Sequence, residues 1–218
     1  MVYSKKTKII LLALILLVLA GVVALASIFK RNDRSESVSI LTPKTPRKVE
    51  IVKLFAMPLS NTKDRITKKH LGTYVTPKNS PVSPEVFTGF HTAVDFETFS
   101  QEQNTDVLVF AICSGDISIK KIANGYGGMV VQNCTLDGSP VTVIYGHVRL
   151  SDMKADVGDI VEKGEFLTNL GTGFGLETGG ERKHLHLGIH NGLGIDTRGY
   201  VANENDLNNW VNFEEWVE

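Results

Sequence analysis

The sequence lacks the short motifs by which several hydrolase and metal sites are usually identified. It has no HExxH, no CxxC pair and no G-x-S-x-G segment. These absences argue against a helical zinc peptidase, a cysteine-based zinc module and a serine-hydrolase elbow. Gly175 and Gly180 have the spacing of a phosphate-binding loop, but Glu181 and Arg182 stand where Lys and Ser or Thr are required. A nucleotide-binding loop is therefore excluded.

The chain also lacks a surplus of positive charge. Its 23 Lys and Arg oppose 24 Asp and Glu. The four lysines of residues 1–30 leave 19 Lys and Arg against 24 acids in the rest, a net charge of −5. Nucleic-acid-binding proteins usually present a basic face, so no nucleic-acid partner is expected. With 42% hydrophobic and 22% charged residues, the 218-residue chain suits one globular domain with attachments.

One long hydrophobic run, residues 9–29, carries no charge. As a helix it would be about 31 Å long, close to the hydrocarbon thickness of a bilayer. Its length favours a transmembrane signal anchor over residues 1–30, because the apolar region of a cleaved signal peptide is usually shorter. A signal peptide cleaved near Ala24 and Ala26 is the alternative. Both interpretations export the rest of the chain, and the anchor would hold it at the cell membrane.

Only two cysteines are present, Cys113 and Cys134. An exported domain lies where disulfides persist. Two cysteines on strands are also commonly small buried hydrophobic residues. The sequence leaves open whether these two form a disulfide.

The remainder of the chain divides into a linker, a β domain and a C-terminal segment. Residues 31–50 mix Ser, Thr, Pro and scattered charge, which is typical of a linker. Residues 51–202 show no helical periodicity over three turns, and several short runs alternate apolar and polar residues as antiparallel strands do. Those runs are residues 106–112, 116–122, 128–133, 140–145 and 184–190. Residues 203–218 are expected to include a short helix that packs Trp210, Phe213 and Val217 on the domain.

Four of the six histidines fall in three compact segments. Residues i and i+2 of a strand share a face, so His184 and His186 should project together, as should His91 and Asp95. Two imidazoles and one carboxylate suit a catalytic zinc ion, which takes three protein ligands and leaves one position for water. Each motif is weak alone, but together with His147 they predict a mononuclear zinc site. His70 and His190 are expected to be structural or surface residues.

From about Phe87 to His190 the sequence resembles the lysostaphin-type (LytM-like) zinc metallopeptidases, which cut peptide cross-links of bacterial peptidoglycan. The matching motifs occur in the family's order. They are the HxxxD of His91 and Asp95, Gly125-Tyr-Gly, Tyr145-Gly-His147, the turn of residues 157–164, Gly171-Thr-Gly and His184-Leu-His186. The resemblance implies a mainly β fold, the antiparallel β-sheet metallopeptidase domain of duplicated-hybrid, lysostaphin-like type.

The same resemblance implies roles for five residues. The metal ligands fall on His91, Asp95 and His186, which would hold one Zn²⁺ per chain. His184 and His147 become the catalytic pair. His184 would act as general base toward water, and His147 would stabilise the oxyanion or protonate the leaving amine.

The expected function is therefore a membrane-tethered, extracytoplasmic zinc endopeptidase acting on peptidoglycan peptides. The alternative is a non-catalytic binding module of the same fold that regulates other cell-wall hydrolases. All five expected positions are filled, which favours the enzyme. One departure is residues 181–183, Glu-Arg-Lys, which lengthen the loop before His184 and add charge beside the substrate subsites.

Overall fold

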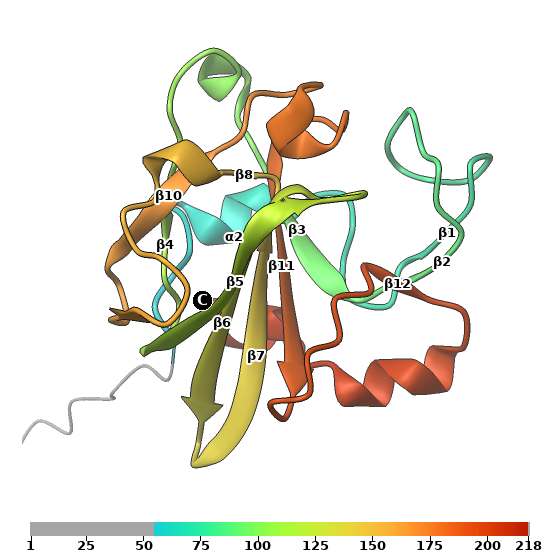
Figure 1. Cartoon of the computed structure of the whole chain (residues 1–218). Coiled ribbons are helices and arrows are strands. Elements are labelled where there is room, and N and C mark those ends of the chain that lie inside the picture. Colours follow the sequence, from blue (N-terminus) through green and yellow to red (C-terminus); the bar gives the residue numbers. More distant parts are fainter. Residues whose placement is uncertain (1–54, 218) are drawn as a thin grey trace, which may run out of the picture. The chain divides into compact units, whose positions relative to one another are not determined.

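The computed structural model describes residues 55–217 (Figure 1). The anchor predicted for residues 1–30 and the linker predicted for 31–50 lie outside the described residues, as does the first part of the predicted domain. Within residues 55–217, no helix is both long enough and apolar enough to cross a bilayer.

Six antiparallel strands form the main sheet, in the order β3-β11-β7-β6-β5-β9 (Figure 1). A two-residue turn joins β6 to β7, with φ 49° at Asp137 and 80° at Gly138. Positive φ at both central residues matches the right-handed twist of the paired strands. The bounds are β3 (Ala93–Glu97), β11 (His184–Asn191), β7 (Ser139–Gly146), β6 (Gly127–Leu136), β5 (Gly115–Ala123) and β9 (Ile160–Val161).

Two small antiparallel sheets flank the main sheet on opposite sides in the view of Figure 1. One contains β1 (Tyr74–Val75), β2 (Gly89–His91) and β12 (Tyr200–Val201). The other contains β4 (Leu108–Phe110), β10 (Phe166–Leu170) and β8 (Val148–Arg149). The first of these sheets brings His91 and Tyr200 to the edge of the main sheet.

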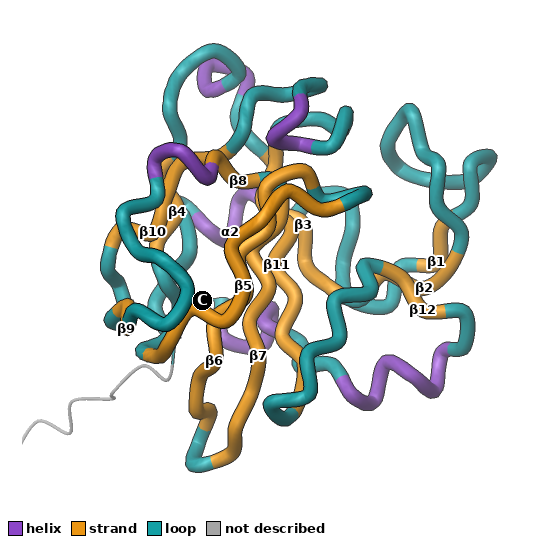
Figure 2. The backbone as a smooth tube through the Cα atoms, in the orientation of Figure 1, coloured by secondary structure: helices purple, strands orange, loops and turns teal. Residues whose placement is uncertain are grey.

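Helical structure in the described residues is short and lies mostly in connections (Figure 2). There is one α-helical turn, α2 (Thr62–Arg65). The 3-10 turns are Ser100–Glu102, Leu150–Asp152, Leu176–Thr178, Glu204–Asn209 and Phe213–Trp216. These observations confirm the mainly β, antiparallel prediction for this part of the chain.

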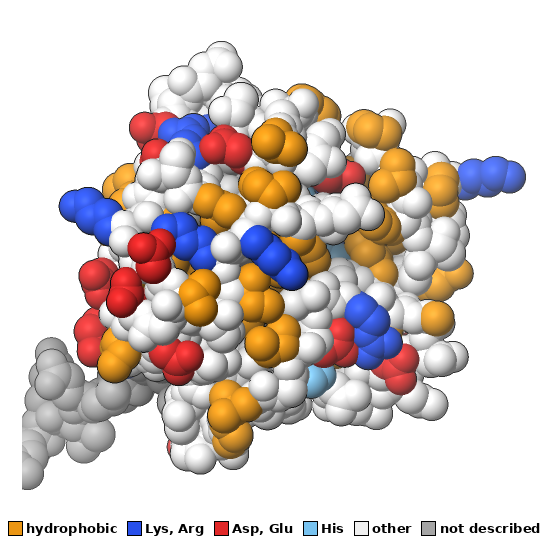
Figure 3. Space-filling model, viewed as in Figure 1, with side chains coloured by type: hydrophobic (Ala, Val, Ile, Leu, Met, Phe, Trp, Pro, Cys, Tyr) orange, Lys and Arg blue, Asp and Glu red, His pale blue; other side chains and the backbone are white. Residues whose placement is uncertain are grey.

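Side chains of the main sheet alternate between two apolar clusters, one on each face. Tyr145, Leu185 and Leu187 belong to the larger cluster, whereas Met129 and Ile144 belong to the smaller one. Leu185 and Leu187 are buried in the larger cluster, which turns their neighbours His184 and His186 to the opposite face, the shared face predicted for these two histidines. On the surface, the face in Figure 3 shows acidic and basic side chains interspersed among scattered apolar ones.

The structure resolves two points left by the sequence. Cys113 and Cys134 form a disulfide that ties the segment just before β5 to β6. The C-terminal segment contains two 3-10 turns with an extended stretch between them, in place of one short helix. The reason is that Trp210 and Phe213 pack into different clusters, and Trp210 also pairs with His190 in a β-bridge.

Candidate metal centre

Three neighbouring strands supply the predicted ligand residues. His186 on β11 lies directly opposite Asp95 on β3 in the antiparallel register. His91 ends β2, and the chain changes sheets at Thr92. That crossing is held by the Thr92 hydroxyl, which donates to the Arg198 carbonyl at 2.6 Å. The change of sheet turns His91 toward Asp95, although the two residues belong to different sheets.

The three candidate ligand atoms form a nearly equilateral triangle. His91 Nε2 lies 3.2 Å from His186 Nδ1 and 3.3 Å from Asp95 Oδ1. His186 Nδ1 lies 3.4 Å from Asp95 Oδ1. Zinc–nitrogen and zinc–oxygen distances of about 2.0–2.1 Å in a tetrahedron place neighbouring ligand atoms roughly 3.3–3.4 Å apart. The triangle therefore has the dimensions of three vertices of a zinc tetrahedron.

The donor set also fits a metal ion by its chemistry. All three side chains are buried. Asp95 Oδ1 is buried and accepts no hydrogen bond, which is costly for a carboxylate oxygen unless a cation satisfies it. Burial opposes ionisation of Asp95, but the surrounding imidazoles, His184 and His91 foremost, hold its pKa well below the ordinary value. Two imidazole nitrogens and one ionised carboxylate are the ligands that catalytic zinc uses.

Each ligand imidazole has a partner for its other nitrogen. His91 Nδ1 lies 3.3 Å from the His70 carbonyl, to which it can only donate. His186 Nε2 lies 3.4 Å from the Tyr126 hydroxyl. Such outer contacts fix the tautomer and the orientation of a metal-binding imidazole. Gly146 makes room for the tyrosine, because a Cβ at this position would lie 2.6 Å from Tyr126 Cδ1.

The two other predicted site histidines lie beside the triangle. The rings of His147 and His184 have centroids 4.2 Å apart. His147 Nδ1 is 2.9 Å from the Thr178 carbonyl, and His184 Nδ1 is 2.9 Å from the Arg182 carbonyl. A carbonyl only accepts, so each Nδ1 is placed to donate to it, and Nε2 of each ring faces the site.

The backbone at His147 is itself unusual. Its φ is 63°, a left-handed conformation that residues other than glycine rarely adopt. Burial, together with the neighbouring imidazoles of His184 and His186, lowers the pKa of His147 well below its ordinary value. His147 is therefore held neutral in a conformation that aims its ring at the site. The structure thus brings all five predicted residues together.

Arg182 was not among the predicted site residues, yet it contacts a candidate ligand. Its Nη2 lies 2.8 Å from Asp95 Oδ2, and its guanidinium also pairs with Glu97 at 2.5 Å. The neighbouring His184 Nε2 lies 3.3 Å from the same Asp95 oxygen. The sequence singled out residues 181–183 as a departure, but it did not show that Arg182 turns inward.

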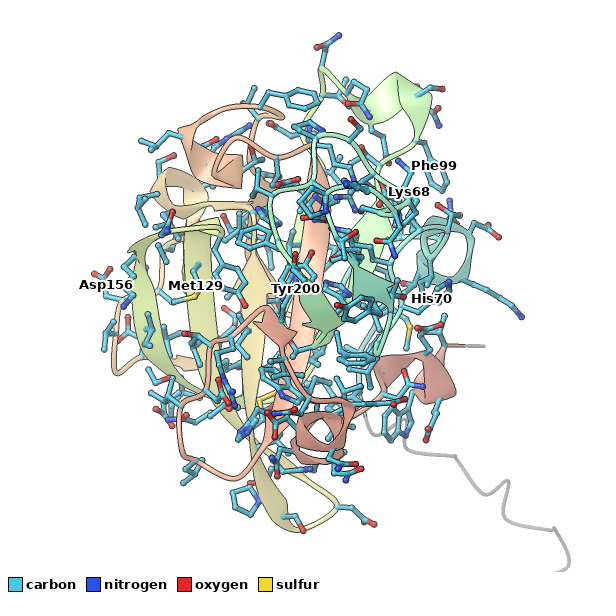
Figure 4. The ribbon with its side chains drawn as sticks, turned by 90° about the vertical axis from the view of Figure 1, so that its right-hand side faces the viewer. Lys68, His70, Phe99, Met129, Asp156 and Tyr200 are labelled. Carbon is cyan, nitrogen blue, oxygen red and sulfur yellow. A yellow bond between two sulfur atoms is a disulfide. The ribbon has the colours of Figure 1, made fainter. Side chains whose placement is uncertain are left out.

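The site opens into a groove of about 380 Å³. Lys69 and Tyr200 line the wall opposite β11, and Figure 4 labels Tyr200 at β12. Lys69 donates to the Tyr200 hydroxyl at 2.7 Å and to the buried Glu85 carboxylate at 2.6 Å. Of residues 55–86, only Lys69 lines the groove, so this part of the chain forms a wall. No sequence motif pointed to Lys69, Glu85 or Tyr200.

The remaining two histidines lie outside the cluster, as expected. His70 is exposed and pairs with Glu214 at 2.9 Å. His190 packs its ring against Trp210, with ring centroids 5.0 Å apart. His70 still contributes through its backbone carbonyl, which accepts from His91.

A His-Asp-His cluster in a groove of an antiparallel sheet, with two further imidazoles beside it, is typical of a zinc-dependent hydrolase. The model of peptidase family M23 matches residues 89–200, more than half of the chain. The chain therefore belongs to peptidase family M23, which confirms the resemblance to lysostaphin-type metallopeptidases and implies a metallopeptidase. The match contains all five site residues.

Solved structures with which the chain shares similarity include lysostaphin and LytU. The catalytic domain of lysostaphin from Staphylococcus simulans is 22% identical, with 66% of this chain and 94% of that chain covered and a TM-score of 0.45. The LytU structure is 18% identical, with 70% and 90% covered and a TM-score of 0.45. No curated protein sequence matches the chain significantly.

Proposed function

We propose that this protein is an extracytoplasmic zinc endopeptidase that hydrolyses peptide cross-links of bacterial peptidoglycan. One observation carries the catalytic part of the proposal: His184 and His147 both hold Nδ1 on a backbone carbonyl and so direct Nε2 toward the ligand triangle. A module that only binds peptides has no need for two imidazoles held in this orientation beside a metal site. Membership of family M23 supports the peptidoglycan substrate.

His91, Asp95 and His186 would hold the metal. Zinc, when bound there, supplies a nucleophile by lowering the pKa of water to about 7. The buried position of the triangle strengthens the electrostatic attraction between Asp95 and a cation, because little water screens it. The hydrogen bonds to the His70 carbonyl and the Tyr126 hydroxyl keep the two imidazoles aimed at one point.

The paired histidines would handle the proton and the developing charge. His184 Nε2 is the base for the attacking water, and its hydrogen bond to the Arg182 carbonyl stabilises the imidazolium that results. His147 directly follows β7, and its ring lies beside that of His184, with ring centroids 4.2 Å apart. There it stabilises the oxyanion of the scissile amide or protonates the leaving amine.

The location of the protein follows from its hydrophobic run and its disulfide. Residues 9–29 would anchor the chain in the cell membrane, with the peptidase domain on the periplasmic or cell-wall side. The Cys113–Cys134 disulfide supports this side of the membrane, because disulfides persist in oxidising compartments. The tether would confine hydrolysis to peptidoglycan close to the membrane.

Cleavage of purified peptidoglycan tests the proposal. The full chain, purified in detergent and loaded with zinc, should release new amino groups from the wall. Mass spectrometry of the soluble products then identifies the bond. His184→Ala should lower turnover by at least about 10²-fold, as loss of a general base does. His190→Ala is the matched control, because this histidine on the same strand lies outside the cluster.

Two results would separate the proposal from its alternative. If wild-type protein bound peptidoglycan but released no amino groups from walls of several cross-link types, the chain would be a binding module instead. If His184→Ala and wild type released amino groups at equal rates, the catalytic pair would be misassigned.

A further inference from the structure

The three charged residues of the loop before β11 point in different directions. Arg182 turns to Asp95 and Glu97. Lys183 is buried, and its ammonium donates to the carbonyls of Glu102 and Thr105. Glu181 is half-buried and lines the groove beside His184. The loop thus contributes one charge to the metal centre, one to the scaffold and one to the groove.

Among the described charged residues that line the groove, Glu181 has no side-chain hydrogen-bond or ion-pair partner in the protein. Among the described residues, its carboxylate forms no hydrogen bond and no ion pair. The other charges that line the groove are paired: Lys69 with Glu85 at 2.6 Å, Arg182 with Asp95, and Arg198 with Asp196 at 2.6 Å.

The nearest candidate cation on the opposite wall is not available to Glu181. Lys69 is buried, and its ammonium is bound by Glu85 and by the Tyr200 hydroxyl. Glu85 is in turn fixed by the backbone N–H groups of residues 86 and 87. Moving Lys69 toward Glu181 would leave Glu85 as an unpaired buried charge, which is costly.

The backbone holds Glu181 in place for a ligand. Its N–H donates to the Thr178 carbonyl at 3.1 Å, and its carbonyl accepts from the Phe174 N–H at 2.6 Å. These two hydrogen bonds close the glycine-rich loop, so the backbone that carries the Glu181 side chain is held in position. Burial raises the pKa of Glu181, although the positive charges of His184, Lys69 and Arg182 oppose this shift.

We propose that Glu181 is a specificity residue that binds an ammonium group of the peptide substrate next to the scissile bond. The inference rests on the proposed function. A primary ammonium supplies both the positive charge and the N–H donors that a half-buried carboxylate lacks. In a peptide this group belongs either to an amino terminus or to the side chain of a diamino acid, and the recognition chemistry is the same.

Binding of soluble peptidoglycan fragments tests the proposal separately from turnover. The probe is the fragment mixture from glycosidase-digested wall, native or acetylated on its amines, titrated into the zinc-loaded full chain. Acetylation should weaken binding to wild type roughly tenfold, the magnitude of one charged hydrogen bond. Glu181→Gln should lose about the same affinity for native fragments and should be insensitive to acetylation. In cleavage assays, its KM should rise while kcat stays close to wild type.

Matched variants and blocked peptides sharpen the result. Glu204→Gln makes the same change of charge at an exposed residue that does not line the groove, and it should behave as wild type. Peptides acetylated only at the terminus or only at the side chain identify which ammonium is bound. Equal effects of acetylation on wild type and Glu181→Gln, or no effect on either, would overturn the inference. Acetylation-sensitive binding without any cleavage would contradict the proposed peptidase activity and leave the role of Glu181 supported.

Discussion

Arg182 holds one oxygen of Asp95 and leaves the other free. Its Nη2 lies 2.8 Å from Asp95 Oδ2, whereas Oδ1 faces His91 and His186 without a hydrogen-bond donor. Glu97, two residues after Asp95 on β3, fixes the guanidinium. The carboxylate is thereby oriented to offer a metal a single oxygen. The charged loop before β11 thus supports the metal centre directly.

Replacing Arg182 should weaken zinc binding. Arg182→Met frees Asp95 to rotate and leaves Glu97 without its main partner, so we expect the zinc dissociation constant to rise about 10–100-fold, as for other residues that orient a ligand. Competition with a chromogenic chelator measures this constant without reference to activity.

Lys68 provides the matched control for this variant. Its Nζ lies 3.2 Å from Glu97 Oε2, but it does not contact Asp95. Lys68→Met also removes a positive charge near Glu97, and zinc affinity should stay within about twofold of wild type, because an exposed ion pair contributes little. Equal losses in both variants would mean that net charge, rather than the orientation of Asp95, sets the affinity.

Tyr126→Phe should also weaken zinc binding without disturbing the fold. The substitution removes the hydroxyl 3.4 Å from His186 Nε2 and keeps the ring that packs beside Gly146. We expect roughly a tenfold loss of zinc affinity. Circular dichroism and the unfolding midpoint of the zinc-free protein should match wild type. Unchanged affinity would show that the ring alone, through its packing, orients His186.

The disulfide should stabilise the domain without contributing to the metal centre. Cys113 and Cys134 are 21 residues apart, and closing a loop of this length stabilises a fold by about 3 kcal/mol on loop-entropy grounds. Replacing both by Ser should lower the free energy of unfolding in urea by about that amount, with one zinc per chain retained. If zinc binding were lost while the fold persisted, the disulfide would have a direct role in the site.

Acid should destabilise the domain partly through Glu102. A bidentate hydrogen bond from the buried Arg65 lowers the pKa of Glu102 below its ordinary value. The native state therefore favours the ionised carboxylate. The contribution of this carboxylate to the free energy of unfolding is complete above about pH 4.5, and it is lost as the pH falls through the lowered pKa.

Glu102→Gln should remove this dependence. Because Arg65 would stay buried without its anion, we expect the free energy of unfolding to fall by about 2 kcal/mol at pH 7. The loss should be smaller than for a fully buried pair, because the Glu102 side chain is 19% exposed. The difference in the free energy of unfolding between the variant and wild type, measured by urea unfolding, should become smaller below pH 4. A gap that stayed constant from pH 7 to pH 3.5 would contradict the assignment to Glu102.

Local patterns predicted much of the architecture, because strand alternation and turn residues act over short distances. Runs such as residues 184–190 carried enough periodicity to locate β11 and to place His184 and His186 on one face. The HxxxD spacing likewise predicted that His91 and Asp95 lie close together, as the structure shows. It could not show the change of sheet at Thr92, which depends on hydrogen bonds to residues 198 and 199.

Contacts between segments that are distant in the chain could not be predicted from the sequence, for a physical reason. Lys69, Glu85 and Tyr200 form a groove wall from three separate segments, and no spacing rule links them. Arg182 was visible as a charge in an unusual loop, but whether it faced solvent or Asp95 depended on the packing of β3 against β11. The disulfide depended on the same kind of long-range geometry.

Metal content tests the central claim most directly. Mass spectrometry of the full chain, equilibrated with zinc and freed of excess metal, should find about one zinc per wild-type or His184→Ala chain and almost none in His186→Ala. Absence of zinc from the wild type, or full retention of zinc by His186→Ala, would contradict the assignment of His91, Asp95 and His186 as its ligands.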